Sequence, residues 1–481
     1  MLMNTGFHFE NKYKYLILLL LTFVSSRMLF SGVGVEFDYS RADKFWQLLD
    51  LDELEHNLLE SLFYLHSQPP IFNLITGLSL KIAPQDPGKL LGVFFHFLGF
   101  FSSLAMFKLF VLLNFSYRSS YLLTSLYFLL PSVVLYEFWF FYTWLVSCFF
   151  IFSAYALQKF VVEKSVPYAV CFFLFIVLIC LTRSLYHMAY LLVVAATLVC
   201  FFKYKRATTT AIAVTAFVVV GGWYLKNQLI FGFFGASSWG GMSAWKMVKD
   251  SPKLDWPEEF SVISEIDEFS PIDFYPQSYS QVPEKFSSIS VLNTKAKEGG
   301  IPNFNHYGYV PLSKNYLKMS ARVASEYPAN YLMNVVHAFG VYSKPSWEYF
   351  FLEKNRSQIQ NYIRLFTMSD IRFFIEHRIF GLDRYFDFPL SSLLVVPFSV
   401  IIILIFSIQY VRFEWLNFGG SNAVPLVLFG VFSIVFTAVM GNLVEIGENH
   451  RFRFQTAPLL WVLFAMSIKW FFAGDKSFRS T

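Results

Sequence analysis

Acidic residues follow the first long apolar run of the chain and come before an amphipathic segment. Asp38 and Asp43 lie closest to the point where that run should leave a membrane. A carboxylate at the mouth of a membrane cavity can act as a general base toward a hydroxyl acceptor. We therefore expect either Asp38 or Asp43 to be the catalytic base. The acids that follow fit the solvated face of a helix: Asp50, Asp52 and Glu53.

Basic residues at two distant places in the sequence have the chemistry to bind phosphate. Arg183 lies at the end of one apolar run, and the segment 448–453 directly precedes the last one. Guanidinium groups bind phosphate oxygens through paired hydrogen bonds. Snorkelling at a helix end explains Arg183 equally well, and a charged loop cap is the alternative for 448–453. The expected phosphate-binding residues are Arg183, His187, Asn449, His450, Arg451 and Arg453.

Three more polar residues are expected to contact substrate. Glu137 is a single acid inside the aromatic run 136–142, where it either hydrogen-bonds a sugar or faces water within an interfacial aromatic belt. His66 and Gln68 follow the acidic segment and directly precede two prolines. We count them with the substrate-binding residues because they share the same predicted loop.

The sequence lacks the motifs of several other chemistries. It has no Walker loop, no HExxH zinc motif and no GxSxG nucleophile motif. Its four cysteines all fall within apolar runs and have no metal-ligand spacing, so no metal site is predicted. Glu36 next to the expected base could still help to hold a divalent cation. The net charge of +5 is spread over the ends of apolar runs, which argues against a nucleic-acid partner.

Composition indicates which elements must position these residues. The 481 residues are 56% hydrophobic and only 15% charged, which leaves too much apolar surface for a soluble fold. Apolar runs near the roughly 20 residues that span a bilayer predict an all-α polytopic membrane protein. We place ten spans at residues 14–33, 89–113, 119–136, 144–162, 166–184, 188–202, 207–226, 390–410, 422–442 and 456–472.

The basic residues between these spans predict the orientation of the chain. Lysines and arginines at 159–164, 203–206 and 412 satisfy the positive-inside rule when both termini are cytoplasmic. All the expected site residues then lie on the outer face. The predicted organisation is an N-terminal membrane module (1–232), an extracytoplasmic domain that is mainly α or α+β (233–388) and a C-terminal membrane module (389–481).

The first outer loop, residues 34–88, is expected to carry juxtamembrane helices. Leucines and phenylalanines recur at near-helical spacing among acids in 43–66, and a short apolar run at 69–83 begins with two prolines. Both fit helices at the outer interface that cover a cavity. In the extracytoplasmic domain, the helical spacing from Leu312 to Ala338 is interrupted at Pro328, which predicts two packed helices.

In the order of its motifs, the chain resembles the integral-membrane glycosyltransferases of the GT-C superfamily, relatives of the protein O-mannosyltransferases and the aminoarabinose lipid A transferase. In that family an acid follows the first span, and juxtamembrane helices carry a His-Pro-Pro-Leu-like stretch, here His66-Ser-Gln-Pro-Pro-Ile71. Glu137 matches an acid after the third span, and the segment 448–453 matches a basic loop before the last. Where the family often has adjacent Asp-Glu, this chain has Glu36-Phe-Asp38, which leaves Asp38 and Asp43 both open as the base.

The resemblance implies an inverting transfer of a sugar from a polyprenyl-phosphate donor to a hydroxyl of a glycan, lipid or protein acceptor. The expected location is a bacterial inner membrane. A transporter or flippase of a lipid-linked sugar would use the same arginines but needs broken helices near the bilayer midplane. An assembly subunit for a surface polysaccharide is the third possibility.

Overall fold

The computed structural model describes residues 5–201, 205–252, 254–367, 390–418 and 423–473. These residues form helices and connecting loops, and no β-strand occurs among them. The β-type backbone pairing there is limited to isolated bridges, of which one joins Asp38 to Trp139. The prediction of an all-α membrane protein is confirmed for this part of the chain.

Within the described residues, six helices are long and apolar enough to cross a membrane. They are α1 (Thr5–Gly32), α5 (Pro87–Leu112), α8 (Tyr142–Glu163), α11 (Arg206–Phe231), α22 (Val424–Val444) and α23 (Asn449–Ala473). A seventh would be α6 (Tyr117–Phe128) together with α7 (Pro131–Glu137), which meet at a bend of 63°. The remaining predicted spans coincide with α9 (Val166–Thr182), α10 (Met188–Phe201) and α21 (Leu390–Phe418). Each predicted span is therefore helical, but ten crossings are not confirmed, because one span is bent and α9, α10 and the described apolar part of α21 are short.

Residues at the helix ends explain where several spans begin and end. Asp86 precedes α5, and its carboxylate accepts a hydrogen bond from the Lys89 amide at 2.9 Å, while Pro87 occupies the first turn. Ser116 caps α6 in the same way through the Ser119 amide at 3.1 Å. Gly232 ends α11 with φ of +76°, a conformation that favours glycine.

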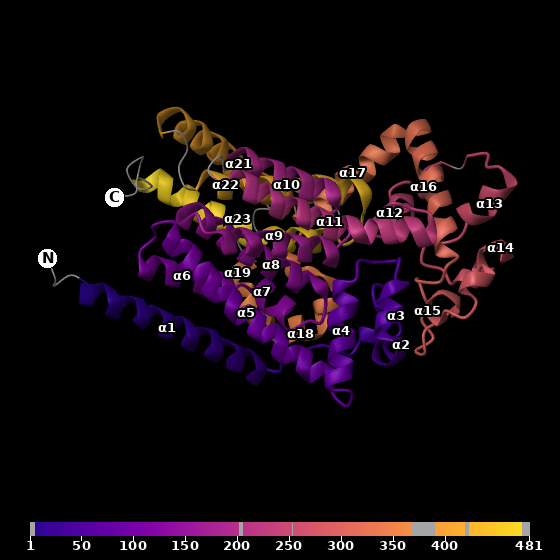
Figure 1. Ribbon diagram of the computed structural model, residues 1–481, viewed down its shortest axis with the longest axis horizontal. Coiled ribbons are helices and arrows are strands. Elements are labelled where there is room, and N and C mark those ends of the chain that lie inside the picture. The colour runs from indigo at the N-terminus through magenta and orange to yellow at the C-terminus, as the bar shows by residue number, and fades with distance from the viewer. Residues whose placement is uncertain (1–4, 202–204, 253, 368–389, 419–422, 474–481) are drawn as a thin grey trace.

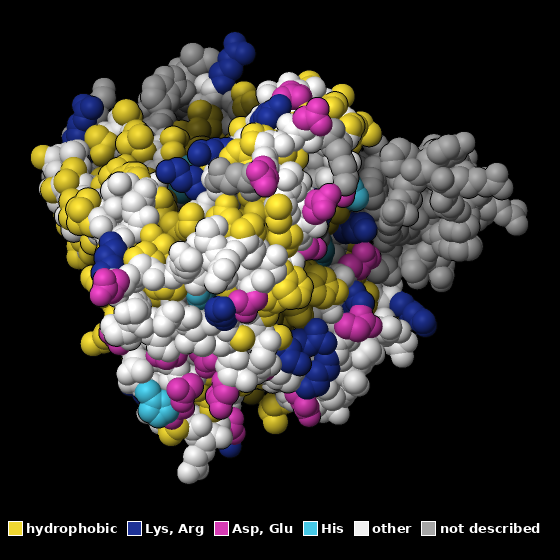
Figure 2. All heavy atoms as spheres, turned by 90° about the vertical axis from the view of Figure 1, so that its right-hand side faces the viewer, with side chains coloured by type: hydrophobic (Ala, Val, Ile, Leu, Met, Phe, Trp, Pro, Cys, Tyr) yellow, Lys and Arg dark blue, Asp and Glu magenta, His cyan; other side chains and the backbone are white. Residues whose placement is uncertain are grey.

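The long helices run side by side, and the polar elements gather at one end of the molecule (Figure 1). The start of α1 and the end of α23 lie together at the opposite end. We call residues 240–326 the polar end, and residues 34–88, which pack against it, the first outer segment. Seen from there, lysine, arginine and carboxylate side chains are interspersed over the surface (Figure 2). The sides of the long helices instead expose large apolar residues, such as Met28 on α1 and Leu229 on α11.

The first outer segment forms short helices instead of the single amphipathic helix expected over 43–66. A 3-10 turn at Ala42–Lys44 precedes α2 (Leu51–His56), α3 (Leu58–Phe63) and α4 (Ile71–Ile82). The expected helix is interrupted at Asn57, whose ψ of 36° is not helical, and Asp50 starts a new helix by capping the Asp52 amide. The helix after the two prolines begins as predicted, directly after Pro70.

Between α11 and residue 367 the chain is helical and irregular. Its elements are α12 (Gly240–Lys246), α13 (Glu258–Ser264), α14 (Gln277–Ser280), α15 (Ser290–Asn293), α16 (Tyr309–Glu326), α17 (Pro328–Ser343), α18 (Glu353–Gln358) and α19 (Gln360–Thr367), with 3-10 turns at Ile272–Phe274, Glu284–Phe286, Ser346–Glu348 and Phe350–Leu352. The pair of helices predicted around Pro328 is present as α16 and α17, which pack together. Part of the predicted domain, 368–389, lies outside the described residues.

The main hydrophobic core surrounds α8, which is the most buried of the six long helices. A second core in the polar end packs α12 against α16, with Trp239 and Tyr316 at its centre. A third joins the first outer segment to the polar end through contacts among Leu54, Leu292 and their neighbours. The first outer segment and the polar end therefore pack as one unit above the long helices.

Candidate functional site

Two buried arginines converge on one tyrosine where α8 and α23 begin and α9 ends. Tyr142 is the first residue of α8, Arg183 directly follows α9, and Arg451 lies in the first turn of α23. The Tyr142 hydroxyl accepts hydrogen bonds from Arg183 Nη1 at 2.8 Å and from Arg451 Nη1 at 3.4 Å. Residues more than 300 positions apart in the sequence thus form one group, which we call the arginine cluster and define as Tyr142, Arg183, Glu448 and Arg451.

The arginine cluster carries more positive than negative charge. Glu448 forms an ion pair with Arg451, and no carboxylate pairs with Arg183 among the described residues. Arg183 is 6% exposed and Arg451 is 2% exposed, and the Nε atom of each is buried without a hydrogen-bond partner. Buried cations are costly unless they are paired. One net positive charge with free donors is the arrangement that an anion would complete.

Aromatic rings form the walls around both guanidinium groups. The Arg183 guanidinium lies 4.2 Å from the centre of the Phe452 ring, and that of Arg451 lies 4.7 Å from the Phe141 ring. Cation–π contacts offset part of the cost of burial but cannot neutralise a charge. The Tyr349 hydroxyl donates a hydrogen bond to Glu448 at 2.7 Å. Burial would raise the pKa of Glu448, but the charge of Arg451 and this hydrogen bond lower it below the usual value.

The other expected residues of the segment 448–453 have structural contacts. Arg453 donates hydrogen bonds to the carbonyl oxygens of Ser343 and Lys344 at 3.1 and 2.7 Å, where it covers the end of α17. The Asn449 amide holds the turn between α22 and α23 by hydrogen bonds within residues 441–447. His450 is 6% exposed, and both of its ring nitrogens are buried without a partner. Of these three, only His450 has free hydrogen-bonding groups beside the cluster.

Asp38 lies beside the segment that leads into Tyr142. Its amide donates to the Phe138 carbonyl at 2.8 Å, and its carbonyl accepts from the Phe140 amide at 3.1 Å. The carboxylate is held by the amide and hydroxyl of Ser40, at 3.1 and 2.6 Å, and the residue is 7% exposed. The stacked rings of Trp139 and Phe141, 4.6 Å apart, connect Asp38 to the arginine cluster. Both groups thus lie along residues 138–142, with packed aromatic rings from one to the other.

Asp43 lies farther into the polar end. The buried Lys297 ammonium donates hydrogen bonds to the carbonyl oxygens of Phe45 and Asp43 at 2.8 and 3.4 Å. Burial lowers the pKa of Lys297 to about 8, against the opposing effect of Asp50 and Asp43. Lys297 therefore joins the first outer segment to the polar end close to Asp43.

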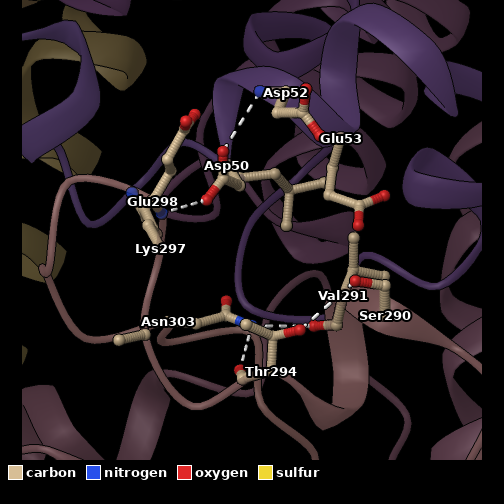
Figure 3. Close-up of a pocket in the computed structure, with 11 residues that line it drawn as sticks. Asp50, Asp52, Glu53, Ser290, Val291, Thr294, Lys297, Glu298 and Asn303 are labelled. Carbon is tan, nitrogen blue, oxygen red and sulfur yellow. Dashed lines mark hydrogen bonds between the residues drawn. The ribbon is translucent and has the colours of Figure 1, made fainter.

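A polar cavity of about 240 Å³ opens next to Lys297 (Figure 3). Asp50 lies between two backbone amides, accepting from Asp52 at 3.1 Å and from Glu298 at 2.6 Å. Asn303 spans the other wall with hydrogen bonds to the Val291 and Thr294 carbonyls. The acids around this cavity are Asp50, Asp52, Glu53 and Glu298. No three histidine, cysteine or acidic side chains are grouped to hold a metal ion in the described part of the chain.

His66 connects the first outer segment to the polar end. Its Nδ1 lies 2.8 Å from the Ser238 hydroxyl and its Nε2 lies 2.9 Å from the Asn305 carbonyl, with no exposed surface. Burial, reinforced by the charge of Lys226, lowers the pKa of His66 to about 3. Gln68 is also buried, at 7% exposure. His66 is therefore a neutral link between two segments.

His187 lies between Arg183 and α10. Its Nδ1 accepts a hydrogen bond from the Ala189 amide at 3.3 Å, and its ring packs on Phe436 at 5.3 Å. Partial burial lowers its pKa. These contacts fit a residue at the start of α10.

Glu137 belongs to a separate buried charged group. Arg27 of α1 holds both of its carboxylate oxygens, at 3.1 and 2.5 Å, and His96 of α5 lies 2.8 Å from one of them. Arg27 also donates to the Phe128 carbonyl at 3.0 Å, which the bend between α6 and α7 leaves free. Glu137 is fully buried and fully bonded. Its surroundings favour a role in holding the bent span over direct contact with a sugar.

Sequence reasoning missed Arg27 and Tyr142. Arg27 is the only charged residue between Lys14 and Glu36, and a lone charge within an apolar run is itself a sign of a buried partner. Tyr142 had no such signal, because tyrosine is common in the aromatic belts at membrane interfaces.

Comparison with known proteins does not assign this chain to a family. No protein-family model matches the sequence, and no match is found among curated proteins or solved structures.

Proposed function

We propose that this chain is a glycosyltransferase that moves a sugar from a polyprenyl-phosphate donor to a hydroxyl acceptor at the polar end, with inversion. The observation that carries the proposal is the arginine cluster. It holds two buried guanidinium groups beside one carboxylate, at the ends of three apolar helices. A phosphate attached to a lipid tail combines the anion and the apolar anchor that such a place suits.

The reaction follows from where charge develops. The acceptor oxygen attacks the anomeric carbon while the bond from that carbon to the phosphate oxygen breaks. The acceptor proton passes to a carboxylate, and the phosphate leaves with one more negative charge than it had in the donor. Arg183 and Arg451 stabilise this added charge, which is the interaction that accelerates such a step.

Asp38 is the better candidate for the base in this proposal. Its backbone pairs with the segment 138–140, which continues into Tyr142, whereas Asp43 lies toward Lys297. The rings of Trp139 and Phe141 are each 2% exposed. The donor sugar and the acceptor must therefore move these rings before Asp38 can reach the acceptor hydroxyl. The acceptor belongs to the glycan, lipid or protein class, and we place the chain in a bacterial inner membrane with the polar end outside.

The proposal is tested by sugar transfer from radiolabelled polyprenyl-phosphate sugars in nanodiscs. Asp38→Asn is expected to abolish transfer while leaving binding of the donor unchanged. Asp43→Asn tests the alternative base, and Asp52→Asn is a matched control on the exposed side of α2. Full activity of both Asp38→Asn and Asp43→Asn would contradict the assignment of the base, and no transfer from any such donor would contradict the enzyme.

A second candidate function is supported by the bent span. A flippase for a lipid-linked sugar needs interrupted helices and charges within the bilayer. The bend of 63° between α6 and α7, with Arg27, His96 and Glu137 beside it, has both features. Vesicles with a fluorescent lipid-linked sugar separate the two functions. A flippase equilibrates the probe between leaflets without an acceptor, and the enzyme consumes it only when an acceptor is present.

A further inference from the structure

Helix α17 has an apolar face that no described part of the chain covers. It packs against α21, α22 and α23 through one side, on which Val335, Ala338 and Val341 are buried. The opposite side exposes large apolar residues at helical spacing: Leu332 (58%), Met333 (67%), Val336 (58%) and Phe339 (37%). Figure 1 shows α17 between the long helices and α16. Four large apolar side chains on one face make a continuous exposed stripe.

Polar groups in the first half of α17 turn away from this stripe. The Tyr331 hydroxyl donates to the Leu443 carbonyl at 2.9 Å, and the Asn334 amide donates to the Met247 carbonyl at 3.0 Å. His337 is exposed. The helix therefore has apolar side chains both toward the protein and toward its surroundings, whereas an ordinary surface helix is polar on its outer side.

The backbone carbonyl groups at the end of α17 accept hydrogen bonds from a side chain, whereas those of a surface helix would bind water. The last carbonyl groups of a helix have no partner within the helix. Arg453 donates to the Ser343 and Lys344 carbonyls at this end. In hydrocarbon an unpaired backbone group is strongly unfavourable, so a helix that ends near lipid needs such a cap.

The apolar face also continues a surface that already fits lipid. α22 is one of the six helices that can cross a membrane, and near its polar end it exposes Val439 (41%) and Val444 (40%). Tyr331 ties the start of α17 to Leu443 at that end of α22. The exposed stripe of α17 thus adjoins the exposed residues of a spanning helix.

We propose that the exposed face of α17 lies in the acyl-chain region of the leaflet at the polar end. Its occupant is lipid hydrocarbon, and α17 is an interfacial helix pressed between the bilayer and α21–α23. The region after α11 would then not be wholly outside the membrane, because α17 returns to it. This inference stands on α17 alone and does not depend on the proposed function.

Spin labels measure the depth of α17 in proteoliposomes of phosphatidylethanolamine and phosphatidylglycerol. Single cysteines replace Leu332, Met333 and Val336 in a background in which Cys171 and Cys200 are alanine. The remaining Cys148 and Cys180 are buried. Val218→Cys on the exposed side of α11 is the lipid-facing control, and Ser325→Cys at the exposed end of α16 is the water-facing control.

Labels on α17 are expected to collide several-fold more often with oxygen than with a soluble nickel chelate, as at position 218, and the order should reverse at 325. Greater access to nickel at 332, 333 and 336 would overturn the proposal. Low access to both reagents would overturn it too, because a protein partner or a second copy of the chain would then cover the face. Three independent label sites keep the test decisive if one variant fails to fold.

Discussion

Replacing Arg183 tests whether the arginine cluster binds phosphate. In Arg183→Gln the charge and its free donors are lost, while the fold loses one hydrogen bond, to Tyr142 at 2.8 Å. A hydrogen bond to a charged group contributes about 1.5–3 kcal/mol. Because a tenfold change in the dissociation constant corresponds to about 1.4 kcal/mol, Arg183→Gln should bind polyprenyl monophosphate about 10- to 150-fold more weakly than the wild type.

The assay is equilibrium binding of a tritiated polyprenyl monophosphate to purified protein in nanodiscs. Arg322→Gln is the matched control, because Arg322 is exposed on α16, where it pairs with Glu326 at 2.9 Å. The control should bind like the wild type. Unchanged affinity in Arg183→Gln, or an equal loss in the control, would refute the assignment of the cluster as a phosphate site.

Further predictions concern stability. Arg451→Gln leaves Glu448, whose side chain is 23% exposed, without its cation, so it should destabilise the protein by about 2–3 kcal/mol. Arg183→Gln should destabilise it less, because the lost hydrogen bond to Tyr142 is offset by removal of a buried charge that has no carboxylate partner. Equal unfolding temperatures of the two variants in detergent would contradict this. Glu137→Gln should destabilise the protein by about 3–5 kcal/mol because Arg27 loses its carboxylate partner. The double variant Arg27→Met with Glu137→Leu removes both charges and should recover much of this loss. No recovery would argue against a purely structural pair. His66 has a pKa of about 3 when folded against 6.5 when unfolded, so the unfolded state binds more protons between these values and stability falls as pH decreases from 6.5. His66→Gln should remove up to about 1.4 kcal/mol per pH unit of this slope. A residual slope should remain from His306, whose pKa is about 4, and from His450, whose pKa is about 3. An unchanged slope would show that His66 is not buried in its neutral form.

Hydropathy located the helices because a spanning helix must be apolar over most of its length. It could not give the rotation of each helix about its axis, which decides what a polar side chain contacts. Arg453 was therefore grouped with Arg451, although two residues apart on a helix they point to different neighbours: the end of α17 and the arginine cluster. The same uncertainty hid the pairing of Glu137 with Arg27, which joins α1 to α7.

The first outer segment was harder to predict for a different reason. The apolar spacing over 43–66 is helical, but the segment packs on both the polar end and the long helices. Asn57 and the capping carboxylate of Asp50 divide it into two helices that can follow this surface. The contacts of His66 with Ser238 and Asn305 join residues more than 170 positions apart. No local pattern in a single sequence carries that information.

The most direct test of the arginine cluster is a cryo-electron microscopy map of the protein in nanodiscs with polyprenyl monophosphate. The phosphate should lie within hydrogen-bonding distance of both Arg183 and Arg451, with the Nε atoms that now lack partners turned toward it. A map in which the lipid phosphate binds elsewhere, while both guanidinium groups keep only their contacts with Tyr142 and Glu448, would contradict the account.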